Sequence, residues 1–170
     1  LDRSSAASDV YKRQGADACL LVTPYYNKPN QEGLYQHFKR IASQSSLPVI
    51  LYNVPSRTGV NIAPETVLRL AKDFENIVAL KEASGNFQQA QTFIKQCHPD
   101  FSILSGDDEM SLPMILAGAK GVISVIGNAI PEIYSKIIKL GLVRNVDEAY
   151  SYQYKILELT RMIYLSLIHI

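Results

Sequence analysis

The chain has 170 residues, of which 47% are hydrophobic and 19% are charged, and its formal net charge is +1 at pH 7. These values are typical of one globular domain with a real core, and the absence of a basic run argues against binding to nucleic acid or to an anionic membrane surface. No apolar stretch is long enough for a transmembrane helix. The two cysteines, Cys19 and Cys97, lack the spacing of a metal site, so a reducing, cytoplasmic setting is expected.

Short apolar runs bounded by turn residues predict five strands, and longer stretches with one apolar face predict helices between and after them. The expected strands cover residues 18–23, 48–53, 77–81, 101–105 and 121–125. The expected helices cover residues 30–45, 63–74, 86–97, 131–140 and 146–164, with a loop at 54–59. Residues 106–109 are expected to lead into one more helix, which ends near residue 118. This alternation indicates an α/β protein built from parallel βα units.

Two architectures fit this order of elements: an open doubly wound sheet and part of a (β/α)8 barrel. A Gly-rich phosphate-binding loop after the first strand would favour the open sheet. That strand is followed instead by Pro24, Tyr25 and Tyr26, so the dinucleotide-binding fingerprint is absent. In both architectures the loops at the carboxyl ends of the strands form the site.

Lys81 stands at the end of the apolar strand that begins at Ile77. A lysine that loses its charge through desolvation becomes a nucleophilic amine, and such amines form Schiff bases with carbonyl substrates. The alternative is a lysine that reaches from the strand end into solvent. Side-chain alternation places Lys81 with Ala79 on one face of the strand and turns Glu82 toward the helices, where it is not a candidate base.

The other strand ends carry residues that suit chemistry on a carbonyl. They are Tyr25, Tyr26, Tyr52, Arg57, Ser105, Gly106 and Ser124. A tyrosine hydroxyl can move protons and an arginine can bind a carboxylate through two parallel hydrogen bonds. Tyr52 is expected beside Lys81 if their strands pair. The alternatives are an aromatic side chain with a wet hydroxyl at Tyr52 and a solvated surface charge at Arg57.

A metal site is the alternative interpretation of the residues at the strand ends. Asp107 and Asp108 precede a helix, where helix capping is the simpler account of two carboxylates. The three histidines are scattered along the chain, so no metal site is predicted.

Five segments closely resemble one family, the 4-hydroxy-tetrahydrodipicolinate (dihydrodipicolinate) synthases. They are TPYYN at 23–27, YNVPSRTG at 52–59, LKEASG at 80–85, LSGDD at 104–108 and GVISV at 121–125. The resemblance runs from about residue 15 to about residue 164. It implies a (β/α)8 TIM barrel with a C-terminal helical extension. It also implies a cytoplasmic lyase that condenses pyruvate with L-aspartate 4-semialdehyde in the diaminopimelate route to lysine.

The resemblance also implies roles for individual residues. Lys81 matches the lysine that forms the Schiff base with pyruvate, so that no cofactor is needed, and Tyr52 matches the proton-relay tyrosine. Tyr26 matches a tyrosine that reaches across a dimer interface into the partner's relay. Tyr25 matches its neighbour near the interface and the lysine-feedback site. Arg57 matches an arginine that helps to bind the carboxylate of the semialdehyde.

Two further positions match the pyruvate site of the family. Ile123 matches a residue whose backbone carbonyl lines that site, and Gly106 is expected beside it. N-acetylneuraminate lyase and the 2-keto-3-deoxy sugar acid aldolases share the lysine and the tyrosine, so a related pyruvate-dependent aldolase is the alternative activity. The segment PSRTG at 55–59 favours the synthase.

A complete member of the family has three more βα units before residue 15 and more helix after residue 164. Residues 15–141 are therefore expected to form a partial barrel of five βα units, and residues 142–164 the first helix of the extension. Residues 1–14 and 165–170 are expected to be atypical flanks. A complete protein is expected to be a homodimer or homotetramer, whereas this chain alone is expected to be inactive because the strand bearing the Thr-Thr-Gly motif is missing.

Overall fold

The structure is a computed structural model that describes residues 14–166, so most of the flanks predicted to be atypical, residues 1–13 and 167–170, lies outside the described residues. The chain divides into two compact units, one up to Ile103 and one from Leu104. All strand pairings described below are parallel. Within residues 14–166, no helix is both long and apolar enough to cross a lipid bilayer.

The first unit contains three parallel strands in chain order, β1 (Cys19–Val22), β2 (Val49–Asn53) and β3 (Ile77–Glu82). Val22 is opposite Tyr52 in the register of β1 and β2. Tyr52 is in turn opposite Lys81 in the register of β2 and β3. Because facing residues of parallel strands point to the same face of the sheet, these three side chains form a row across it.

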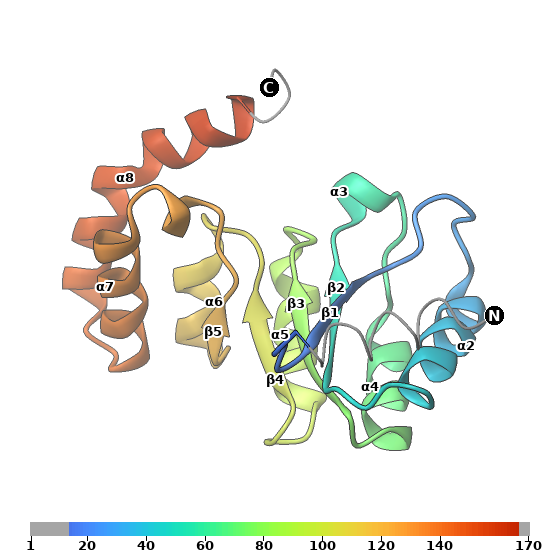
Figure 1. Cartoon of the computed structure of the whole chain (residues 1–170). Coiled ribbons are helices and arrows are strands. Elements are labelled where there is room, and N and C mark those ends of the chain that lie inside the picture. Colours follow the sequence, from blue (N-terminus) through green and yellow to red (C-terminus); the bar gives the residue numbers. More distant parts are fainter. Residues whose placement is uncertain (1–13, 167–170) are drawn as a thin grey trace. The chain divides into compact units, whose positions relative to one another are not determined.

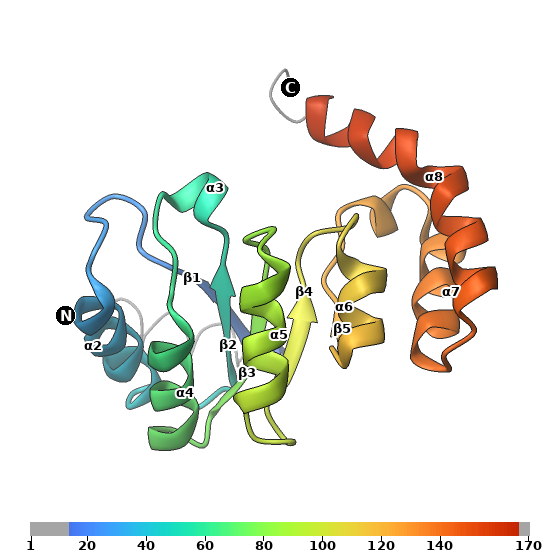
Figure 2. The ribbon, with the colours of Figure 1, turned by 180° about the vertical axis from the view of Figure 1, so that it is seen from behind.

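Three helices of the first unit cover one face of these strands: α2 (Gln31–Ala42), α4 (Pro64–Asp73) and α5 (Phe87–Gln96) (Figures 1 and 2). The amino ends of α2 and α5 are capped by asparagine side chains. The side-chain oxygen of Asn30 accepts from the Gly33 amide, and that of Asn86 from the Gln89 amide. The core between sheet and helices is made by Leu34, Phe38, Leu51, Leu70, Leu80 and Phe93.

The second unit holds the end of β4 (Ser102–Ser105), which pairs with the short strand β5 (Gly121–Val122). Its helices are α6 (Ser111–Ala117), the 3-10 turn η1 (Ile126–Asn128), α7 (Pro131–Leu142) and α8 (Val146–Ser166). In this unit α7 packs against α6 and α8. Apolar side chains such as Leu112, Ile126 and Ile137 form its core.

Two of the expected elements differ clearly from the structure. The expected loop at 54–59 contains a helical turn, α3 (Pro55–Thr58), which ends at Gly59 in a left-handed conformation with φ 66°. The expected strand at 121–125 ends at Val122, and the Val125 amide donates to the side chain of Asp108 at 3.1 Å instead of to a neighbouring strand. The helix expected after residues 106–109 begins at Ser111, after a turn in which Asp107 accepts backbone amides.

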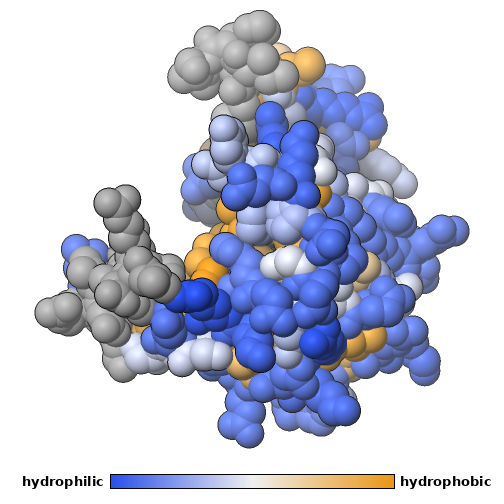
Figure 3. Space-filling model, turned by 90° about the vertical axis from the view of Figure 1, so that its right-hand side faces the viewer, coloured by the Kyte–Doolittle hydropathy of each residue, from blue (hydrophilic) through white to orange (hydrophobic). Residues whose placement is uncertain are grey.

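The surface shown in Figure 3 is mostly hydrophilic, with small hydrophobic patches. Two exposed apolar residues belong to β1, where Leu20 is 43% exposed and Val22 is 37% exposed. Both lie on the strand face that includes Tyr52 and Lys81 in the register. The face that carries the candidate nucleophile therefore also carries two apolar side chains that meet solvent.

Candidate active site

The centre of the candidate site is the pair formed by Lys81 and Tyr52 at the carboxyl ends of β3 and β2. Lys81 is buried, with 8% of its surface exposed. Its Nζ lies 4.3 Å from the centre of the Tyr52 ring, within the range of a cation–π contact. The expected adjacency of these two residues is confirmed, because the two strands pair in the register that alternation requires.

The hydroxyl of Tyr52 remains protonated at neutral pH. Partial burial is the main cause that raises its pKa, and the charge of Arg57 opposes this rise without cancelling it. A neutral phenol can donate a proton or a hydrogen bond to an oxygen that becomes negative beside it. Arg57 itself is exposed on α3, which follows β2 directly.

Thr23 and Thr58 connect the turn that carries Arg57 to the end of β1, a contact that the local sequence does not predict. Both side chains are buried, and the Thr23 hydroxyl donates to the Thr58 hydroxyl at 3.3 Å. The Thr58 hydroxyl also accepts from the Val60 amide. Arg57 thus stands on a helical turn whose last residue, Thr58, is bonded to the end of β1, although its own side chain is exposed.

Glu82 points away from Lys81 toward the helices, as alternation predicts, and is almost completely buried. Its carboxylate accepts from the side chain of Asn53 and from the Ser84 amide. Gln89 of α5 reaches the same carboxylate at 3.4 Å, which places Glu82 on the helix side of the sheet. Side-chain alternation argues against Glu82 as a base, but it does not predict these partners.

In the second unit, Gly106 and Ile123 follow the ends of two paired strands. The Ile123 amide donates to the carbonyl of Ser105 at 2.8 Å, which continues the pairing one residue past β5. This bond brings Ile123 next to the residue before Gly106, as expected. The Ser124 hydroxyl accepts from the Gly127 amide and so caps the turn that follows. The roles of Gly106 and Ile123 toward a substrate stay predictions.

Asp108 holds that same turn and is not the cap of its own helix, which corrects the expectation for this residue. Its Oδ2 accepts from the amides of Val125 and Ile126 at 3.1 and 2.8 Å and from the Tyr164 hydroxyl. Asp107 does cap the turn before α6, through the Glu109 and Met110 amides. Among residues 14–166, no three His, Cys, Asp or Glu side chains form a group that could hold a metal ion.

Tyr25 and Tyr26 lie in the segment between β1 and α2 and are 65% and 89% exposed. Their exposure suits residues that meet a second subunit, a role that stays a prediction. Cys97, at the end of α5, is half-buried, and burial raises the pKa of its thiol to about 11. This thiol is therefore a poor nucleophile at neutral pH.

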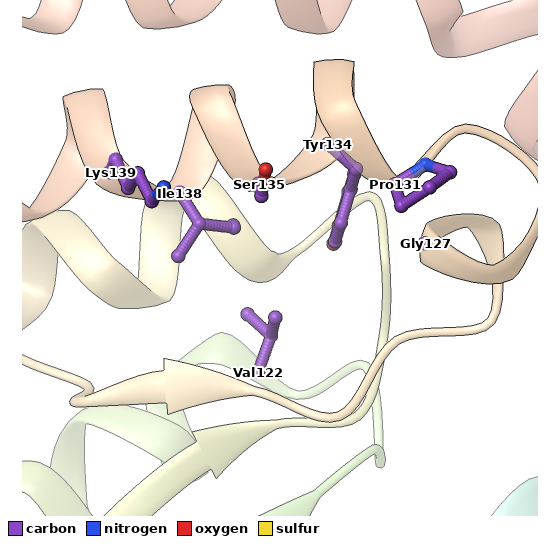
Figure 4. Close-up of a pocket in the computed structure, with 7 residues that line it drawn as sticks. All are labelled: Val122, Gly127, Pro131, Tyr134, Ser135, Ile138 and Lys139. Carbon is purple, nitrogen blue, oxygen red and sulfur yellow. The ribbon is translucent and has the colours of Figure 1, made fainter.

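A separate cavity of about 400 Å³ lies between β5 and α7. In Figure 4, Val122 of β5 points toward α7, and Ile138 and Tyr134 of α7 line the opposite side. None of the predicted site residues lines this cavity. It is therefore distinct from the strand-end site.

Comparison with known proteins identifies the family of the chain. The model of the dihydrodipicolinate synthetase family matches residues 1–169. The 4-hydroxy-tetrahydrodipicolinate synthase of Flavobacterium psychrophilum is 57% identical over 147 residues, which make up 86% of this chain and 50% of the relative. The chain spans about half the length of the curated relatives that it matches.

Solved structures give the same result. The chain is similar to the 4-hydroxy-tetrahydrodipicolinate synthase of Methylacidiphilum fumariolicum, with a TM-score of 0.92, 42% identity and coverage of 95% of this chain and 54% of that chain. It is also similar to the dihydrodipicolinate synthase of Acinetobacter baumannii in complex with pyruvate, with a TM-score of 0.89, 42% identity and coverage of 94% and 55%. Because these synthases are TIM barrels, the predicted partial barrel is confirmed, and the chain belongs to the dihydrodipicolinate synthetase family.

Proposed function

We propose that this chain carries the Schiff-base half of the active site of a 4-hydroxy-tetrahydrodipicolinate synthase, which condenses pyruvate with L-aspartate 4-semialdehyde. The observation that carries the proposal is the buried Lys81 amine facing Tyr52 at the carboxyl ends of two paired strands. The pyruvate complex of the similar synthase from Acinetobacter baumannii supports pyruvate as the first substrate. The names of the curated relatives favour the synthase over a sugar acid aldolase.

The first steps of the proposed mechanism use the lysine as nucleophile and electron sink. The neutral Lys81 amine attacks the ketone carbon of pyruvate, and loss of water leaves an iminium. A proton then leaves the methyl group, and the electron pair moves toward the iminium nitrogen to give an enamine. The Tyr52 hydroxyl is suited to move protons in these steps because its pKa is raised and it remains protonated.

The carbon–carbon bond forms when the enamine adds to the aldehyde carbon of the second substrate. Arg57, next to Tyr52 in the first unit, would bind the carboxylate of that substrate through charge-assisted hydrogen bonds. In the second unit, the backbone carbonyl of Ile123 and the segment at Gly106 are proposed to contact pyruvate. The exposed Tyr25 and Tyr26 would contact a second subunit in a homodimer or homotetramer.

Borohydride trapping tests the nucleophile. A full-length chimera is made in which the 147 matched residues of this chain replace their counterparts in the Flavobacterium psychrophilum synthase. Pyruvate and borohydride together should add mass irreversibly at Lys81, and the Lys81→Ala variant should not be labelled. Labelling that survives this substitution would exclude Lys81 as the nucleophile. Turnover with L-aspartate semialdehyde, N-acetylmannosamine and glyceraldehyde then distinguishes the synthase from the two aldolase classes.

A second candidate is that the 170-residue chain alone is an inactive part of such an enzyme. The chain spans about half of its relatives, and Leu20 and Val22 are exposed on the face that carries Tyr52. In a closed barrel, interior side chains are covered by those of the remaining strands. Condensation activity measured on the 170-residue chain decides this point, and activity close to that of the chimera would contradict the inactive form.

A further inference from the structure

We propose that Glu82 and Asn53 form a positioning pair that fixes the ends of β3 and β2 and thereby holds Lys81 opposite Tyr52. Each member of the pair directly follows one of the two site residues in the chain. The inference rests on the proposed function, because it assigns a role in Schiff-base formation to residues that would not touch the substrate.

The two strand ends are joined by a backbone bond and by a side-chain bond. The Asn53 carbonyl accepts from the Ala83 amide at 2.9 Å. The Asn53 Nδ2 donates to the Glu82 Oε2, also at 2.9 Å. Both side chains are buried, with 0% and 2% of their surface exposed. A bond between two buried side chains is hard to replace with water, so the link persists only while both partners have matching donor and acceptor atoms.

The direction of this bond is set by backbone groups that can only donate. The Ile62 amide donates to the Asn53 Oδ1 at 3.1 Å, which turns the Asn53 Nδ2 toward Glu82 and toward the Asn61 side chain. The Ser84 amide donates to the Glu82 Oε1 at 2.7 Å. The residue at 82 must therefore accept at both of its terminal oxygens, as an ionised carboxylate does and a carboxamide does not.

The pair lies on the helix side of the sheet, whereas Lys81 and Tyr52 lie on the other face. A rotation or a slip of either strand end would displace Lys81 and Tyr52 relative to each other on the far face. Catalysis is sensitive to displacements of this kind, because a misplacement of about 1 Å can cost about a hundredfold in rate. Glu82 and Asn53 would thus act on Schiff-base formation through position and not through contact.

The test uses three variants of the full-length chimera. Glu82→Gln keeps the size of the side chain. Its amide nitrogen would face another donor, either the Asn53 Nδ2 or the Ser84 amide. Asn53→Asp places two carboxylates against each other. The double variant E82Q/N53D restores the link with donor and acceptor exchanged, since the glutamine amide can donate to the aspartate while its oxygen still accepts from Ser84. Glu75→Gln makes the same chemical change at an exposed turn and is the matched control.

The readout is the rate of borohydride trapping with pyruvate per folded molecule, with folding followed by circular dichroism and the KM for pyruvate measured alongside. We expect each single variant to be trapped about 10- to 100-fold more slowly, with a smaller change in KM. We expect the trapping rate of the double variant to lie within about threefold of the parental rate, and the trapping rate of the control to equal the parental rate.

The outcomes separate the two proposals. A parent chimera that is not trapped at Lys81 contradicts the proposed function itself. If the parent is trapped and the folded single variants react at the parental rate, the positioning role is overturned. A double variant that reacts no faster than the single variants also overturns it. If the single variants fail to fold, the double variant must fold and react at the parental rate, and a double variant that is unfolded or slow overturns the proposal.

Discussion

The Nζ of Lys81 lies 4.3 Å from the centre of the Tyr52 ring, across two parallel strands whose register places the two residues opposite each other. The ring covers one side of the amine, and burial keeps the phenol in its protonated form. The pair therefore combines a shielded amine with a neutral hydroxyl, which are the two groups that iminium formation requires.

Replacing Tyr52 with phenylalanine keeps the ring against the amine and removes only the hydroxyl. We expect the turnover number of the full-length chimera to fall by about a hundredfold, because a positioned general acid or base contributes that much or more. Steady-state kinetics measures this change. Tyr154→Phe, at an exposed position of α8, is the control and should keep full activity. A Tyr52→Phe enzyme with parental turnover would contradict the relay role.

Replacing Arg57 with alanine should separate the two substrates. We expect the KM for L-aspartate semialdehyde to rise about 10- to 100-fold, since a hydrogen bond to a charged group contributes about 1.5–3 kcal/mol. The rate of borohydride trapping with pyruvate alone should not change. Arg40→Ala, on the exposed part of α2, is the control. A parallel loss of pyruvate trapping would show that Arg57 serves the first substrate or the fold.

Replacing Asp108 with alanine should destabilise the second unit. The change leaves the amides of Val125 and Ile126 without their acceptor, which costs about 2 kcal/mol when such groups are buried. Tyr164→Phe removes one donor to the same carboxylate and should cost less, because Tyr164 is only partly buried. Urea unfolding followed by circular dichroism ranks the two variants. An Asp108→Ala variant as stable as the parent would contradict this role.

The buried thiol of Cys97 is expected to contribute to the loss of folding stability at alkaline pH. Burial raises the pKa of its thiol from an ordinary value of 9.0 to about 11. The folded state therefore keeps its proton more tightly than the unfolded state, and the resulting stabilisation is complete below pH 9 and is lost as the pH rises through about 11. The Cys97→Ser variant should lose less stability than the parent between pH 9 and pH 11. Thermal unfolding at pH 7, 9 and 11 measures the difference, and equal losses would contradict the burial of the thiol.

The order of strands and helices could be predicted because it depends on local patterns of apolar residues and on turn residues. The same holds for the facing of Tyr52 and Lys81, since side chains alternate along a strand and consecutive parallel strands commonly pair. The short turn α3 was missed because four residues carry too little periodicity to be recognised, although Gly59 at its end was visible as a turn residue.

The partners of the buried polar groups could not be predicted. Asp108 bonds to amides 17 and 18 residues away, Thr23 to a hydroxyl 35 residues away and Asn53 to a carboxylate 29 residues away. Nothing in the local sequence distinguishes a carboxylate that caps its own helix from one that holds a distant turn. Only the packing of the elements decides which of the two occurs.

The sequence by itself determined the parallel βα order, the family and the lysine and tyrosine at neighbouring strand ends, because these depend on composition, alternation and short motifs. The tertiary structure decided which groups hold those ends in place. It assigned Glu82 and Asn53 to a buried link behind the site and Asp108 to the turn after β5. The physical reason is that a buried donor or acceptor must find a partner, and the register and packing of the whole unit determine which partner lies within reach.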